Sequence, residues 1–113
     1  MSASGTRELS LKPREAALPE IRAFWNPDRG VLIAGTQVPA PVGDRTFQLW
    51  VVPKSGDPIS AGIFRPDAAG KVLAVSTVVI ELEGTAALAI SEEPAGGLPQ
   101  PSKDKIRWVG PVT

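Results

Sequence analysis

Proline and glycine divide this chain into short segments, and their placement limits every element that it can form. The sequence contains twelve prolines and eleven glycines, about a fifth of its 113 residues, against about 12% in an average protein. They fall between apolar runs and do not gather in low-complexity tracts. Because proline interrupts helices and sheet ladders while glycine favours turns, each cluster ends the run before it. The sequence therefore predicts short elements joined by turns.

The apolar runs alternate in the manner of strands. In "TFQLWVVP" the side chains of Phe47, Leu49 and Val51 point to one face, and those of Gln48 and Trp50 point to the other. Both faces are nearly apolar, so this strand is expected to lie in the centre of its sheet, with a proline ending it. The best helical candidate, "PREAALPEIRAF", is interrupted by a proline and lacks a 3.6-residue period.

Similar runs recur about every 10 to 15 residues, with turn-forming residues between them. This spacing predicts an all-β fold: an antiparallel β-sandwich of about seven to eight short strands, either immunoglobulin-like or a small-barrel variant. We expect 20–35 to form a hairpin over the turn "NPDRG", and 46–76 to form an antiparallel meander. The expected strands are 7–12, 20–26, 31–35, 46–53, 60–65, 71–76, 86–93 and 105–110.

One domain accounts for most of the chain. Residues 20–110 are expected to form the β-sandwich, and residues 1–19 an N-terminal arm or first strand that is partly flexible. The longest nearly apolar run, 72–80, has nine residues, against about 20 for a membrane span. We therefore expect no transmembrane helix within this sequence, and its first residues lack the apolar segment of a signal peptide.

The composition removes several classes of chemistry. The sequence has no cysteine and no histidine, which excludes disulfides, thiolate metal sites and the commonest general base. Twelve basic and twelve acidic residues give a net charge of +0, so nothing steers the chain toward nucleic acid or an anionic membrane. We expect no cofactor, no metal, no nucleic-acid partner and no enzymatic activity.

Two groups of carboxylates are the strongest candidates for catalysis. Glu81 and Glu83 are expected to share one face of a strand, and Glu92 and Glu93 are adjacent. Paired carboxylates carry out acid–base chemistry on sugars, or bind calcium where further oxygens converge. A solvated acidic face that protects a sheet edge has the same sequence pattern. We interpret both groups as solvated faces, and the alternative is a hydrolase that uses Glu81, Glu83 or Glu93.

Other local patterns have simpler structural explanations. Lys54–Ser55 and Ser102–Lys103 each place a serine beside a lysine, but adjacent side chains of an extended chain point apart. "RPDAAGK" (65–71) lacks the spaced acids of a calcium loop and predicts a turn. "PAGG" (94–97) lacks the lysine–hydroxyl pair of a phosphate-binding loop, so its glycines are expected to supply positive φ.

The three tryptophans could form a sugar-binding platform, but core packing is the more economical interpretation. Trp50 and Trp108 lie inside apolar runs and are expected in the core. Trp25 stands just before a turn and is expected to be the most exposed of the three.

Two segments together carry a resemblance to a known family. "FQLWVVPKSGDPISAGIFRPDAAGKV", followed by "LAISEEPAGGLPQPSK", resembles the C-terminal, extracytoplasmic domain of the anti-sigma-K factor family, and the similarity extends over about residues 20 to 110. The family's strand aromatic is often tyrosine and here is Phe47, so a hydroxyl contact made there is lost. The motif positions are Gln48, Leu49, Trp50, Gly62, Phe64, Pro66, Glu93, Pro94, Gly96 and Gly97.

The resemblance implies a regulatory protein with parts that this sequence does not contain. In such a protein a cytoplasmic domain binds an extracytoplasmic-function sigma factor, one helix crosses the plasma membrane, and the present domain lies outside. A membrane protease then releases the sigma factor in response to a signal. The resemblance supplies no catalytic residues. It implies that this sequence is the outer domain alone, which does not bind sigma factor itself.

A role as a shield follows as a hypothesis from the lack of reactive groups. The folded domain would protect the segment near the membrane, and unfolding or ligand binding would expose it to proteolysis. The alternative function is a stand-alone extracytoplasmic carbohydrate- or protein-binding module that uses Trp25 and nearby loops. Pairing of edge strands between two copies to form a homodimer is a further option.

Overall fold

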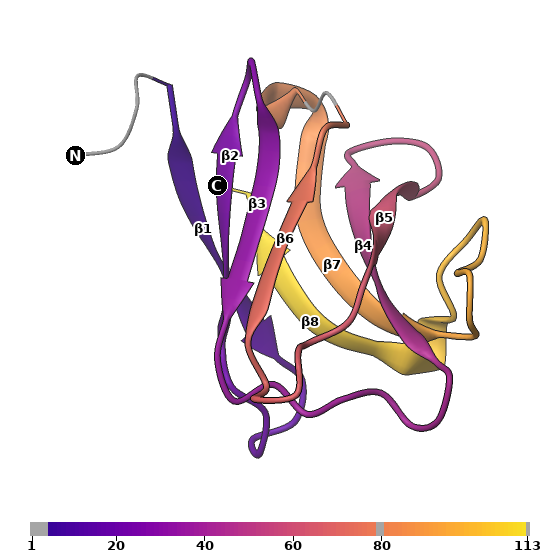
Figure 1. The fold of residues 1–113 in the computed structure, drawn as a ribbon. Helices are drawn as coiled ribbons and strands as arrows, with labels where there is room; N and C mark the ends of the chain where they lie inside the picture. Colours follow the sequence, from indigo (N-terminus) through magenta and orange to yellow (C-terminus); the bar gives the residue numbers. More distant parts are fainter. Residues whose placement is uncertain (1–4, 79–80, 113) are drawn as a thin grey trace.

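The fold consists of short strands joined by turns (Figure 1). It was obtained as a computed structural model that describes residues 5–78 and 81–112. No helix within these ranges has the length and hydropathy to cross a lipid bilayer. Its elements are β1 (Arg7–Pro13), β2 (Ile21–Asn26), β3 (Gly30–Gly35), β4 (Thr46–Pro53), β5 (Ile59–Phe64), β6 (Val72–Ser76), the 3-10 turn η1 (Leu82–Gly84), β7 (Thr85–Glu93), the 3-10 turn η2 (Lys103–Lys105) and β8 (Ile106–Pro111).

The strands form one antiparallel sheet that curls until it is nearly closed and barrel-like. Their order is β5-β4-β7-β8-β1-β2-β3-β6, which confirms the all-β, antiparallel prediction. Strand β1 joins the two halves, because Arg7 to Leu11 pair with β2 while Lys12 and Pro13 pair with β8. Strands β5 and β6 are the two ends of the order, and they face each other on the side shown in Figure 1.

The meander predicted over 46–76 is wrong. Strand β5 pairs with β4 as expected, but β6 pairs with β3, with Leu32 opposite Val75. The cause is the wide loop after β5. In it, Asp67 Oδ1 accepts the backbone N–H groups of Ala69 and Lys71, and the Gly70 carbonyl accepts the N–H of Val38. This contact carries the chain over to β3.

Strand β4 is central and buried on both faces, as its sequence predicts. Leu49 and Val51 are 3% and 4% exposed and face the core inside the curl. Trp50 points to the outer face and is 0% exposed, so another segment must cover that face. Residues buried inside the curl include Leu9, Leu11, Ile21, Ala23, Val31, Ile33, Val38, Phe47, Leu49, Val51, Ala61, Val72, Leu88, Ile90 and Trp108.

The hairpin predicted over 20–35 is confirmed, and its turn depends on one glycine. The Asn26 side-chain oxygen accepts the backbone N–H of Asp28 at 2.8 Å, and Gly30 leaves the turn with φ +99°. A Cβ atom on Gly30 would lie 2.0 Å from the Ser76 carbonyl oxygen of β6. Only glycine fits there, since the backbone conformation and the close approach both exclude a side chain.

We expect Gly30→Ala to lower the free energy of unfolding by about 3 kcal/mol, because it combines backbone strain with displacement of β6. Urea denaturation measures the change. The matched control is Gly84→Ala, since Gly84 has an ordinary φ and open space around its Cα, and its effect should stay within about 0.5 kcal/mol. Equal effects of the two substitutions would contradict the account of the turn.

Candidate functional site

The segment 94–102 is the cover over the outer face of β4 and β7. It leaves β7 after Glu93, turns through a hydrogen bond from Gly97 N to Pro94 O at 2.9 Å, and returns to the sheet at Ser102. Gly96 and Gly97 have φ of +86° and +77°, as the "PAGG" pattern predicts. We call residues 94–102 the covering loop.

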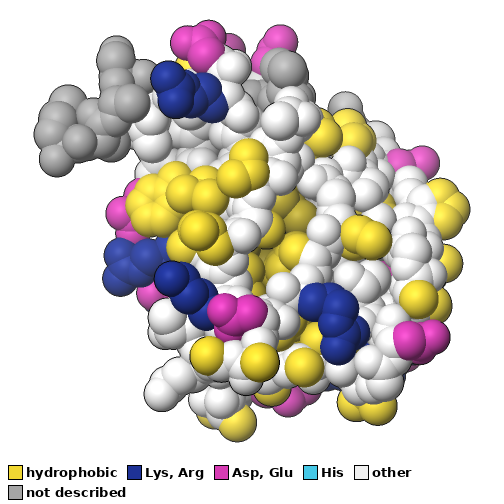
Figure 2. Space-filling model, viewed as in Figure 1, with side chains coloured by type: hydrophobic (Ala, Val, Ile, Leu, Met, Phe, Trp, Pro, Cys, Tyr) yellow, Lys and Arg dark blue, Asp and Glu magenta, His cyan; other side chains and the backbone are white. Residues whose placement is uncertain are grey.

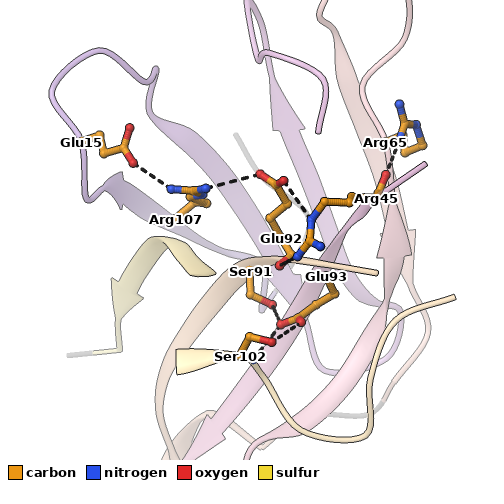
Figure 3. A network of polar contacts seen from close by, with 8 residues as sticks. All are labelled: Glu15, Arg45, Arg65, Ser91, Glu92, Glu93, Ser102 and Arg107. Carbon is orange, nitrogen blue, oxygen red and sulfur yellow. Dashed lines mark hydrogen bonds and ion pairs between the residues drawn. The ribbon is translucent and has the colours of Figure 1, made fainter. Parts of the chain in front are cut away.

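The carboxylate of Glu93 fixes the end of the covering loop to the sheet (Figure 3). Its Oε2 accepts the Ser91 hydroxyl at 2.6 Å and the Ser102 backbone N–H at 2.8 Å. Its Oε1 accepts the Ser102 hydroxyl at 2.6 Å. Trp50 Nε1 donates to Ser91 Oγ at 2.8 Å and extends the network beneath the loop. The Glu93 side chain is 0% exposed, so neither of its oxygens faces solvent.

Glu93 is charged in spite of its burial. Burial alone raises the pKa of this carboxyl, but hydrogen bonds from Ser102 and Ser91, aided by the positive charge of Arg45, outweigh it and lower the pKa below the ordinary 4.5. A carboxylate with its oxygens so engaged is a structural anion. It accepts three hydrogen bonds, is closed off from solvent, and has no proton to give at neutral pH.

Gln48 holds the middle of the covering loop. Its amide oxygen accepts Leu98 N–H at 2.9 Å, and its amide nitrogen donates to Leu98 O at 3.0 Å and to Ser60 Oγ at 2.8 Å. A Cβ on Gly97 would approach Gln48 Oε1 to 2.8 Å and Ile63 Cγ2 to 2.9 Å, so glycine is needed for this contact. The motif glutamine therefore joins β4, β5 and the loop.

The two loop glycines allow the backbone effect and the contact effect to be separated. Gly96→Ala places a Cβ in open space, so we expect it to cost only backbone strain, about 1 kcal/mol. Gly97→Ala adds a clash with Gln48, and we expect about 2 kcal/mol. Urea denaturation of both variants measures the difference. A Gly97→Ala variant as stable as Gly96→Ala would contradict the packing described here.

The motif residues of β5 shape an irregular strand end. Leu49 of β4 stands opposite two residues, Ala61 and Gly62, because the register shifts by one between Gln48 and Trp50. Gly62 adopts φ +117° in this bulge. Phe64 returns to the inner side, with its ring 5.7 Å from that of Phe47, and Pro66 lies in the loop that leads to β6.

Glu92 points away from Glu93 and lines a cleft beside Phe47 and Trp108. Its Oε2 pairs with Arg45 Nε at 3.1 Å, and its Oε1 lies 3.6 Å from Arg107 Nη2. Arg107 Nη1 also pairs with Glu15 Oε1 at 2.8 Å, which completes a chain of alternating charges (Figure 3). The cleft has a volume of about 270 Å³ and borders this chain of charges.

Both interpretations of the carboxylates as solvated strand faces need correction. Glu92 and Glu93 are 9% and 0% exposed, because ion pairs and the covering loop bury them on opposite sides of β7. Glu81 and Glu83 are exposed, but they flank Leu82 in the 3-10 turn and share no strand face. The Thr85 hydroxyl donates to Glu81 O at 2.8 Å and helps to close this turn. The two pairs stand at opposite ends of β7.

The remaining candidates take structural positions. Ser102 contacts Glu93 and forms no dyad with Lys103, and "RPDAAGK" is a turn. Trp50 and Trp108 are 0% exposed and cannot offer a sugar platform, whereas Trp25 is half-buried as expected. Trp108 Nε1 donates to Pro19 O at 2.7 Å. Among the described residues, no group of acidic side chains is arranged to hold a metal ion.

The arrangement agrees with a comparison across protein families. Residues 11–106 match the family model described as "Anti-sigma-K factor rskA, C-terminal". The chain belongs to this family. No curated protein and no solved structure matches it. The resemblance in the sequence is thereby confirmed, and the chain is related to regulatory proteins of the anti-sigma factor class, which are generally not enzymes.

In this anti-sigma-K factor domain, part of the motif meets at the covering loop although its residues are far apart in sequence, whereas Leu49 and Phe64 pack on the inner side of the sheet. Gln48 and Trp50 of β4 lie beneath the covering loop, where Gln48 bonds to Leu98 and Trp50 bonds to Ser91. Glu93 and Gly97 attach the loop to the sheet. Ser102, which binds the Glu93 carboxylate, is outside the motif. Its only sequence signal is a hydroxyl at the position where the loop ends.

Proposed function

We propose that this domain is the extracytoplasmic regulatory part of a membrane-bound anti-sigma factor, and that its folded state shields the protein from regulated proteolysis. The observation that supports the proposal most is the use of Glu93, the one fully buried charged side chain in the described residues. Its carboxylate holds the covering loop in place and faces no cavity. Because its buried charge holds a loop against the sheet, the domain is suited to act as a stable cover over the segment near the membrane.

The partners in this proposal act on other parts of the protein. An extracytoplasmic-function sigma factor would bind a cytoplasmic domain, and a transmembrane helix would connect that domain to this one on the outer side of the bacterial plasma membrane. A membrane protease would cut the connecting region. The net charge of +0 gives the outer domain no electrostatic attraction to nucleic acid or to anionic lipid, which supports a role confined to protein contacts.

The test is proteolysis of the full-length regulator in membranes. We expect Leu49→Asp, which places a charge at a position 3% exposed in the core, to increase the rate of cleavage by at least about tenfold by unfolding the shield. Val42→Asp is the matched control, because Val42 is 76% exposed and its substitution leaves the fold intact. Cleavage of the Leu49→Asp protein at the wild-type rate would show that the fold does not protect the chain.

A binding module remains a second candidate, and the cleft beside Arg107 favours it. The cleft combines the charged groups of Glu15, Glu92 and Arg107 with aromatic edges from Phe47 and Trp108, a combination typical of small-ligand sites. Titration with cell-wall fragments would change the fluorescence of Trp108 if this cleft binds them. The change should be lost in Arg107→Ala, and no change at all would leave only the first candidate.

A further inference from the structure

Within the residues that the structure describes, the sheet has one opening, between β5 and β6. Each of these strands ends the strand order, so each has one edge with no neighbouring strand. We call the space between the two edges the seam. Ile33, Leu49 and Ala74 form its apolar floor, and Ala61 to Phe64 and Val75 form its sides. Figure 2 shows this region as a hollow with hydrophobic side chains at its base.

Exposed hydrophobic side chains gather on the two strands of the seam. Ile59 and Ile63 of β5 are 53% and 50% exposed, and Leu73 and Val75 of β6 are 66% and 69% exposed. The other exposed large hydrophobic side chains in the described residues are Val42 at 76% and Leu98 at 36%, and both lie in loops. Val75 also adjoins Leu32 of β3 in the sheet register, which extends the apolar pairing onto β3.

Neither strand carries the protection that free edges usually have. The sequences "ISAGIF" and "VLAVS" contain no charged residue and no proline. Edge strands normally use charges or proline to prevent pairing with another chain. Strand β5 has a bulge at Gly62, but β6 is regular and pairs with β3 over its whole length. The edge of β6 is therefore available for a further strand.

The geometry favours a single extended strand as the occupant. A second copy of this chain that paired through its own β6 would bring its β3 alongside, into the space held by β5. A single strand has no such neighbour. It could bond to β6 on one side and cover Ile63 on the other. Its inward side chains would have to be small, since the seam encloses only about 30 Å³.

One end of the seam is positively charged. Arg65 follows β5 and Lys71 precedes β6, and both line a pocket of about 330 Å³ with Leu73. Asp67 lines it too, with its Oδ1 bound to two backbone N–H groups of its own loop, so the pocket holds two cations and one anion and keeps an excess of positive charge. No acidic side chain pairs with Lys71 among the described residues. A strand that runs antiparallel to β6 would end here, so a carboxylate at its C-terminal end would complement the two cations.

We propose that the seam binds an extended segment of a partner protein, with small and apolar residues in alternation and a carboxylate at the end that lies beside Arg65 and Lys71. The segment adds a strand to the edge of β6 and covers the exposed side chains of both strands. This partner is distinct from the sigma factor, which the proposed function assigns to a cytoplasmic domain.

The test uses a fluorescein-labelled peptide of alternating valine and alanine that carries a polar N-terminal tail and ends in glutamate. Fluorescence anisotropy should show saturable binding to the intact domain. Methylation of the peptide's backbone nitrogens should weaken its binding at least about tenfold, because it removes the hydrogen bonds that the peptide donates to β6. Val75→Lys should abolish binding, while Val42→Lys, an equally exposed site in a loop, should leave it unchanged. Binding of the peptide should slow amide hydrogen exchange in β6, whether or not exchange in β5 slows as well.

The charge at the end of the seam is tested by a swap. Lys71→Glu should weaken binding of the glutamate-ended peptide about fivefold and should strengthen binding of a twin that ends in lysine. A glutamate-ended peptide with an amidated C-terminus keeps the side-chain carboxylate but lacks the terminal one, so it distinguishes the contributions of the two groups to binding. No saturable binding of either peptide, binding that methylation does not affect, or concentration-dependent dimerisation that Val75→Lys abolishes would each overturn the proposal, the last in favour of a second copy.

Discussion

The Leu49→Asp variant of the isolated domain is expected to be unfolded at neutral pH. Leu49 lies in the middle of β4, between β5 and β7, and is 3% exposed. Among the described residues near it, only apolar side chains line the floor of the seam, so an aspartate there has no cation to pair with. An unpaired buried charge costs several kcal/mol, against a total stability of about 5–15 kcal/mol for a domain.

Circular dichroism and amide NMR spectra measure this loss of structure. Leu49→Ala is the matched variant, because it removes the same side chain without adding a charge. It should remain folded and lose about 2–4 kcal/mol. A folded Leu49→Asp domain with the stability of the alanine variant would mean that the seam admits water to this position and that the core is not closed there.

Glu93→Ala is the second substitution with a large expected effect, about 4 kcal/mol in the free energy of unfolding. It leaves the hydroxyls of Ser91 and Ser102 and the Ser102 backbone N–H without their acceptor. Each unsatisfied buried donor costs about 1–3 kcal/mol. Urea denaturation measures the change. Glu83→Ala, at an exposed position of η1, is the control and should change stability by less than about 0.5 kcal/mol.

The stability contributed by Glu93 also depends on pH. Its folded pKa is lowered, so the folded state binds fewer protons than the unfolded state in acid. The contribution is complete above the ordinary value of 4.5 and is lost as the pH falls through the lowered pKa. We expect the stability difference between wild type and Glu93→Gln to be largest at neutral pH and to shrink on acidification below 4.5. A difference that grows in acid would contradict the charged state of Glu93.

The sequence predicts the strands of this domain well because they depend on local patterns. Alternation in 46–53 and the turn "NPDRG" need only neighbouring residues, and both are found where expected. The partner of β6 could not be predicted in the same way. It depends on the contact between Gly70 and Val38, which lie 32 residues apart, and no local pattern specifies such a contact.

The candidate site was harder to predict than the strands, because it also depends on contacts between residues that are apart in the sequence. "EE" at the end of a strand is usually solvated, and the burial of Glu93 depends on a loop that returns nine residues later with Ser102. The family resemblance identifies Gln48, Glu93 and Gly97 as a set, but it does not say that they touch. The structure supplies that relation and shows that the set closes a loop over the sheet.

The proposed shielding function depends most on the link between folding and cleavage, and a stability series in the full-length regulator tests this link directly. The series comprises Gly96→Ala, Gly97→Ala, Gly30→Ala and Glu93→Ala, with Val42→Asp as the exposed control. If the protease acts on the unfolded domain, the cleavage rate should rise about tenfold for each 1.4 kcal/mol of stability lost, and the control should match wild type. A cleavage rate that stays constant across the series would contradict the shielding function.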